Sequence, residues 1–153
     1  MSTFSLVKAL HILGVVLWIG GVAFVTLILI PSIRRLNHLE NQYVFFEKIE
    51  HRFAWQARFT TLLTGITGFY MVEELDAWGR FLMMEFWWMH AMVIVWFIFT
   101  LMLFVLEPLF LHKQFIVLSK KEPQRLMQRV QFLHHLLLII SLITLLGAML
   151  GTH

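Results

Sequence analysis

Histidines occupy matching places in the two halves of this sequence. His11 and His90 each open a long apolar stretch, which closes near a proline and is followed by a basic connection. A further histidine then follows, His51 in the first half and His134 with its neighbour His135 in the second. The order histidine, proline, basic connection, histidine therefore occurs twice. This repetition indicates two pseudo-repeated helical hairpins that run in the same direction.

Imidazole nitrogens placed in this way suit the axial ligation of iron. Two histidines from facing helices can hold a b-type haem inside a helical bundle. Because the two hairpins would be related by an axis along the membrane normal, His11 would face His90 near one surface. His51 would face His134 near the other surface, with His135 as the alternate ligand. The pattern predicts one or two bis-histidine haem sites.

A flat macrocycle can approach a helix backbone only where side chains are small, and such residues accompany the histidines. Gly14 and Trp18 follow His11 on one helical stripe, and Gly65 lies in a run of glycines and threonines at 60–68. We expect Gly14, Trp18 and Gly65 to contribute to the cofactor site. Glycine and threonine at this spacing are also what transmembrane helices use to pack together, so a structural interpretation stands beside the functional one.

Arg58 is an ionisable residue inside an apolar stretch, which makes it a functional candidate. It lies two turns after His51 on the same face, about 10 Å further along a helix. It could pair with a haem propionate or with Glu107, or its long stem could carry the charge to the membrane boundary.

Two other functions use the same residues. Copper or another metal could be handled by the histidines, with Met89 or Met92 as soft thioether partners. Alternatively, the chain is a non-catalytic membrane subunit or assembly factor whose histidines are structural. The chain has no cysteine, which excludes disulfides, thiolate metal sites, iron–sulfur clusters and covalent haem attachment.

Four apolar stretches are long enough to position these side chains across a bilayer. About 20 apolar residues in a helix cross the hydrocarbon core, and helices satisfy their own backbone there. The mean hydropathy of the chain is +0.79, which exceeds that of ordinary soluble domains. We therefore predict a single all-α domain over residues 1–153, an integral membrane four-helix bundle. Its expected spans are approximately 9–33, 53–72, 86–110 and 132–150.

The charges between these spans predict the orientation of the chain. The second connection is mainly acidic, with Glu73, Glu74, Asp76 and Glu85 against Arg80. The first and third connections are basic; their cations are Arg34, Arg35, Lys48 and Arg52, then Lys113, Lys120, Lys121, Arg125 and Arg129. By the positive-inside rule these two connections are cytoplasmic and both termini are outside. We expect a multi-pass protein of a bacterial-type inner (cytoplasmic) membrane, with no nucleic-acid partner.

Short motifs resemble two related membrane families, the copper-resistance protein D-like proteins and the haem-binding protoporphyrinogen oxidase that works without flavin. The matching residues cover most of the four-span core; they are KALHI at 8–12, Trp18, Gly20 and Gly21, LTG at 63–65, and WMH at 88–90. Resemblance to the oxidase implies haem b bound through His11. That family carries a lysine two positions after its third-helix histidine, where this chain has Met92, so the oxidase activity is not carried over. Resemblance to the other family implies membrane handling of copper.

The combined hypothesis is a membrane b-type haem protein that passes electrons to or from a quinone or a partner redox protein. Haem supplies the redox chemistry, and the protein supplies axial ligands, burial and nearby charge. The sequence leaves open whether the protein is a haem-dependent oxidoreductase. It also leaves open whether it forms a homo-oligomer.

Overall fold

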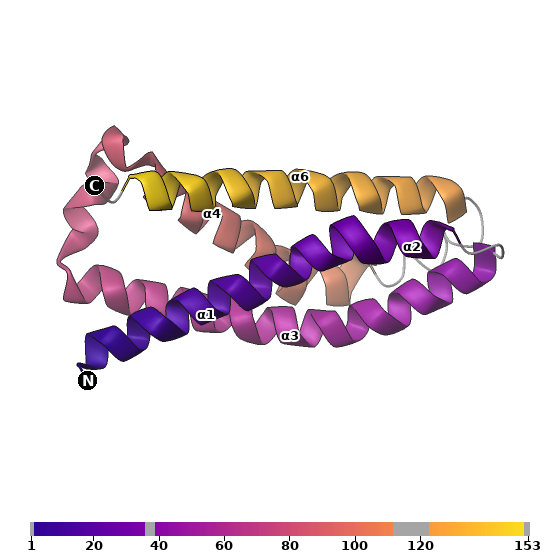
Figure 1. Cartoon of the computed structure of the whole chain (residues 1–153), viewed down its shortest axis with the longest axis horizontal. Helices are drawn as coiled ribbons and strands as arrows, with labels where there is room; N and C mark the ends of the chain where they lie inside the picture. The colour runs from indigo at the N-terminus through magenta and orange to yellow at the C-terminus, as the bar shows by residue number, and fades with distance from the viewer. Residues whose placement is uncertain (1, 36–38, 112–122, 152–153) are drawn as a thin grey trace.

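A computed structural model of the chain is a bundle of long helices (Figure 1). The structure describes residues 2–35, 39–111 and 123–151, and these ranges contain no β-strand. Helical stretches long and apolar enough to cross a membrane are Thr3–Arg34, Met84–Leu106 and Arg125–Leu150. The predicted all-α class is therefore confirmed for the described residues. Three helical stretches there, against the four expected, are long and apolar enough to cross a membrane, which suggests a membrane protein.

The first hairpin pairs a broken helix with an unbroken one. α1 (Thr3–Phe24) continues through a π-helical segment, η1 (Val25–Leu29), into the short α2 (Ile30–Arg34). The side chain of Ser2 caps the start of α1 by accepting a hydrogen bond from the Ser5 N–H. α3 (Leu39–Glu74) then returns alongside α1 (Figure 1). α3 starts 14 residues before the expected span of 53–72.

The connection between the hairpins is made of tight turns. Asp76 adopts a left-handed conformation with φ 47° and ψ 41°, which aspartate tolerates better than most residues. Two 3₁₀-helices follow, η2 (Ala77–Leu82) and η3 (Met84–Phe86).

The second hairpin repeats the plan of the first. α4 (Trp87–Leu101) continues into a π-helical segment, η4 (Met102–Leu111). α6 (Pro123–Leu150) then runs back, and it begins at a proline, a residue that suits the first helical turn. The start of α1 and the end of α6 lie at the same end of the bundle (Figure 1).

Each π-helical segment is associated with a proline. Proline has no N–H to donate, and its ring collides with the carbonyl four residues earlier, so a wider helical turn relieves both problems. η1 directly precedes the turn that holds Pro31, and Ile30 donates its N–H to the Val25 carbonyl five residues back. η4 contains Pro108. The two hairpins therefore share a backbone irregularity as well as the sequence order.

Small residues let α1 and α3 approach closely, and this is the most extensive helix pair among the described residues. A Cβ added at Gly14 would lie 2.6 Å from the Thr64 hydroxyl and 3.4 Å from the Thr60 carbonyl oxygen. A Cβ at Gly21 would collide with the ring of Phe53. Glycine at these two positions thus sets how near the helices lie.

Between residues 54 and 69, α3 carries its threonines inward and its large apolar residues outward. The buried face includes hydroxyl and small side chains; they are Ala54, Ala57, Thr60, Thr61, Thr64 and Thr67. The exposed face is apolar at helical spacing; its residues are Trp55, Phe59, Leu62, Ile66 and Phe69, between 43% and 69% exposed.

Two clusters of buried apolar side chains hold the hairpins together. The first joins η1 and α2 to α6; it consists of Val25, Leu29, Ile30, Ile33, Leu126, Met127 and Val130. The second joins α1 to α4 and α6 at mid-height; it consists of Trp18, Ile19, Val22, Val95, Phe99 and Leu138. Near the first cluster, Arg34 donates a hydrogen bond to the side-chain oxygen of Gln131.

The close approach of α1 to α3 gives a test of the fold. Replacing Gly14 with leucine forces the helices apart, and we expect a loss of about 1–3 kcal/mol in the free energy of unfolding. Gly20→Leu is the matched control, because a Cβ there meets nothing within 4 Å. Unfolding by a denaturing detergent, followed by circular dichroism, measures both. Equal stabilities of the two variants would contradict this packing.

Candidate functional site

The predicted histidine pairs lie at corresponding ends of the bundle. His11 is in the third turn of α1 and His90 in the first turn of α4, towards the end where α1 starts and α6 stops (Figure 1). His51 and His134 are each in the fourth turn of a helix that starts at the other end. At mid-height α1 and α4 contact each other through the rings of two buried residues, Trp18 and Phe99.

His11 is held against α3 in one orientation. Its Nδ1 lies 3.1 Å from the Thr64 carbonyl oxygen and 3.1 Å from the Thr67 hydroxyl. A carbonyl only accepts, and the Thr67 hydroxyl donates to the Leu63 carbonyl at 2.6 Å. Nδ1 therefore carries the proton of the neutral ring and Nε2 carries the lone pair. A Cβ at Gly68 would lie 3.2 Å from the ring, so this glycine makes room for the imidazole.

His134 and His135 adopt the same tautomer by a local route. The Nδ1 of His134 donates to the Val130 carbonyl at 2.9 Å, and that of His135 donates to the Gln131 carbonyl at 2.8 Å. Both rings are half-buried, and both direct the lone pair of Nε2 away from their own helix turn. In metal-ligating histidines, the ring nitrogen that does not bind the metal typically donates to a carbonyl in the same way.

The other two candidates differ. His90 donates from Nε2 to the Phe81 carbonyl at 2.8 Å, and its ring packs edge-on against the Phe81 ring at 5.6 Å. Its unprotonated nitrogen is thus Nδ1, next to the backbone. His51 is exposed. The predicted inner pairing of His51 with His134 stays a prediction.

The glycines expected beside a macrocycle are covered by protein side chains. A Cβ at Gly65 would lie 2.6 Å from the indole of Trp96, whose Nε1 donates to the Thr61 carbonyl at 2.9 Å. Gly14 faces the Thr64 hydroxyl. The donor set of the histidines fits haem, whereas the space beside Gly14 and Gly65 is filled. Any macrocycle bound through His11 must therefore lie away from these two glycines.

Trp18 places a free donor in the middle of the bundle. Its side chain is 4% exposed and packs edge-on against Phe99 at 4.9 Å, yet its Nε1 has no hydrogen-bond partner among the described residues. The same holds for the hydroxyl of Thr61, which is fully buried.

Arg58 has a backbone partner that the sequence reasoning missed. Its Nε donates to the Leu103 carbonyl at 3.0 Å, and its guanidinium lies 5.8 Å from the ring centre of Trp55. In a π-helix the N–H of residue 108 would bond to the carbonyl of residue 103, but Pro108 has none. Arg58 thus supplies the donor that the proline lacks. The side chain of Glu107, its expected partner, lies outside the described residues, as do Lys113, Lys120 and Lys121.

A metal site with three or more protein ligands finds little support in the described part of the chain. No group of three histidine, cysteine, aspartate or glutamate side chains gathers within residues 2–35, 39–111 and 123–151. Met89 is buried and Met92 is 38% exposed. A bis-histidine haem needs only two ligands, and a copper site of histidine with methionine is not covered by this observation, so both alternatives stay open.

No protein-family model, curated protein or solved structure matches this chain. The fold is an α-helical bundle with three helical stretches, among the described residues, that could cross a membrane, and with histidines of fixed tautomer at two levels. The resemblance to the two families above stays a prediction that rests on sequence motifs.

The partnership of Arg58 with Pro108 can be tested by a double-mutant cycle. Arg58→Met leaves the Leu103 carbonyl without its donor and should lower stability by about 1–3 kcal/mol. In a Pro108→Ala background residue 108 regains its N–H, so the effect of Arg58→Met should shrink by about 1 kcal/mol or more. Unfolding by a denaturing detergent gives the four free energies.

Pro31 provides the control for this cycle, because it occupies the corresponding place in the first hairpin. The effects of Arg58→Met and Pro31→Ala should add. If the free-energy changes of Arg58→Met and Pro108→Ala also added, Arg58 would not compensate for the missing N–H of Pro108.

Proposed function

We propose that this chain is a membrane b-type haem protein that takes part in electron transfer, with His11 as an axial ligand. The observation that supports the proposal is the fixed imidazole of His11. Hydrogen bonds to α3 keep the proton on Nδ1, so the lone pair of Nε2 remains for iron. Bound haem would supply the exchange of single electrons, and a quinone or a partner redox protein would be the donor or acceptor.

The second outer ligand is His90 in this proposal. To bind iron through Nε2, it has to release the Phe81 carbonyl, which the turn at η2 presents. That turn would then rearrange when haem binds. At the other end, His134 or His135 offers the lone pair of Nε2, whereas His51 is exposed and has no hydrogen bond in the described residues that fixes its tautomer. The outer site is therefore the one that we propose first.

Absorption spectroscopy tests the haem proposal. Protein purified from haem-replete cells should show the spectrum of a low-spin haem that can be reduced, with a stoichiometry of one or two per chain. His11→Ala should abolish or shift the outer-site signal, because no other side chain of α1 supplies an imidazole. His153→Ala, at the last residue, is the control and should leave the spectrum unchanged.

A helical but colourless wild-type protein would contradict haem binding. It would favour the second candidate, a non-catalytic membrane subunit or assembly factor in which His11 and His90 only tie helices and turns together. The filled space beside Gly14 and Gly65 favours that candidate. Elemental analysis of the same sample addresses copper, since metal without porphyrin would indicate metal handling.

We also propose that α3 is a fourth span and that both termini lie outside. Thr3–Arg34, Met84–Leu106 and Arg125–Leu150 qualify by hydropathy alone. α3 lies along α1 for most of its length, and its outer face is a stripe of large apolar residues that only lipid or another protein would cover. Its arginine and threonines point inward, where the protein itself satisfies them.

Introduced thiols test this topology, because the chain has no cysteine of its own. Ser2→Cys and Gly79→Cys should react with a membrane-impermeant maleimide on intact cells, and Lys48→Cys should react only after permeabilisation. All three positions are exposed. If Lys48→Cys and Gly79→Cys reacted from the same side, α3 would not cross the membrane.

A further inference from the structure

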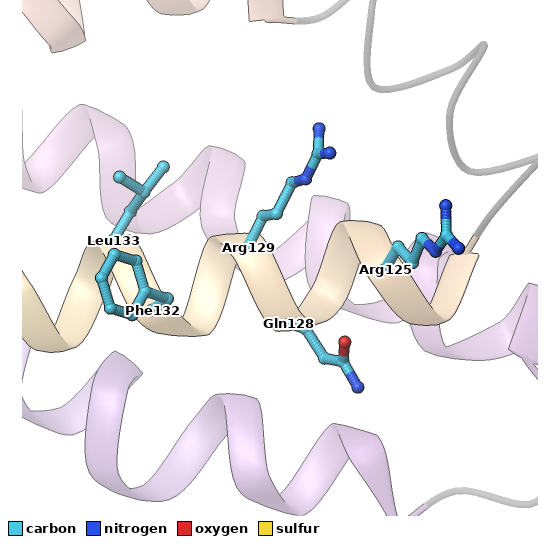
Figure 2. A pocket seen from close by; sticks show the side chains of 5 residues that line it. All are labelled: Arg125, Gln128, Arg129, Phe132 and Leu133. Atoms are coloured by element: carbon cyan, nitrogen blue, oxygen red, sulfur yellow. The ribbon is translucent and has the colours of Figure 1, made fainter.

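A cavity lies beside the first turns of α6, at the end opposite the start of α1 (Figures 1 and 2). Its volume is about 520 Å³, and its lining is formed by Arg125, Gln128, Arg129, Phe132 and Leu133. None of these residues belongs to the histidine sites. The lining changes from cationic to apolar within a few residues of one helix.

The cationic part consists of two guanidinium groups one helical turn apart. Arg125 and Arg129 project from the same side of α6, whereas Gln128 projects from the other side (Figure 2). The planar guanidinium group binds phosphate oxygens through paired hydrogen bonds, which lysine cannot do. Two such groups next to one cavity favour a single anion of the phosphate type.

The apolar part of the cavity begins one turn further along α6, towards its C-terminal end. Phe132 is 67% exposed and Leu133 is 52% exposed, and from there to residue 150 the helix carries apolar residues on its outer surface. By the helical rise, Phe132 lies about 4.5 Å further along the axis than Arg129. The cavity thus spans the change from polar to apolar surface. A free inorganic anion would contact only the cationic part, at Arg125 and Arg129.

We propose that this cavity binds an anionic phospholipid of the cytoplasmic leaflet. The phosphate would lie between Arg125 and Arg129, and the first part of an acyl chain would lie on Phe132 and Leu133. Basic pockets at the cytoplasmic ends of transmembrane helices are suited to such headgroups. The assignment to the inner leaflet rests on the proposed topology, whereas the recognition of the lipid does not depend on haem.

Native mass spectrometry of the full chain, released from detergent, tests the proposal. The probes are phosphatidylglycerol and phosphatidylcholine with identical acyl chains. The wild type should retain phosphatidylglycerol preferentially. Each arginine near an anionic lipid contributes about fivefold to the affinity, so R125Q/R129Q should weaken retention of phosphatidylglycerol by roughly 25-fold. Retention of phosphatidylcholine should stay the same.

The control variant is Lys8→Gln/Arg80→Gln, which removes the same charge from the other end of the bundle and should keep the preference. Arg129→Lys keeps the charge but lacks the planar guanidinium group, so its retention of phosphatidylglycerol should lie between those of the wild type and R125Q/R129Q. This single substitution keeps the proposal testable if R125Q/R129Q does not fold. Equal retention of both lipids by the wild type, or no change in R125Q/R129Q, would overturn the proposal. Full displacement of the lipid by inorganic phosphate would overturn it too, as it would indicate a simple anion site.

Discussion

Buried polar groups of a membrane-embedded bundle have to find their hydrogen-bond partners inside the protein, and this constraint governs the whole arrangement of helices. Threonine and serine hydroxyls on the buried faces mostly donate to carbonyls one turn back on their own helix. Where a proline removes a donor, the backbone widens into a π-helix. In the second hairpin the guanidinium of Arg58 reaches across from α3 to the Leu103 carbonyl. An arginine inside an apolar stretch is thereby explained without a cofactor.

The same constraint shapes α3 and its contact with α1. Threonine side chains are small and donate to carbonyls of their own helix, so they form a face that another helix can approach. Gly14 of α1 packs against this face. The approach brings the imidazole of His11 within reach of the Thr64 carbonyl. Close packing and a fixed histidine tautomer are consequently two results of one helix contact. The apolar side chains of α3 are left for the outer surface.

The hydrogen bonds of the histidines serve two interpretations at once. A bond from Nδ1 to a carbonyl ties helices together, and it also orients Nε2 as a metal ligand. Which role applies depends on what Nε2 meets. His90 uses Nε2 within the protein, whereas His11, His134 and His135 bond through Nδ1 and keep Nε2 available. Chemistry at one end and lipid recognition at the other are compatible, since they use different residues of different helices.

The sequence by itself determined the helical class, the membrane association, the long apolar stretches and the doubled order of histidine and proline. These follow from local composition and spacing, because lipid permits few alternatives to a helix. Only the tertiary structure decided that Trp96 covers Gly65, that His90 donates to Phe81 and that Arg58 bonds to Leu103. Each joins residues at least nine positions apart, and periodicity along one helix does not specify which side chain of another helix meets it. The helical spacing of Thr60, Thr64 and Thr67 was the one local signal that could have indicated the partners of His11.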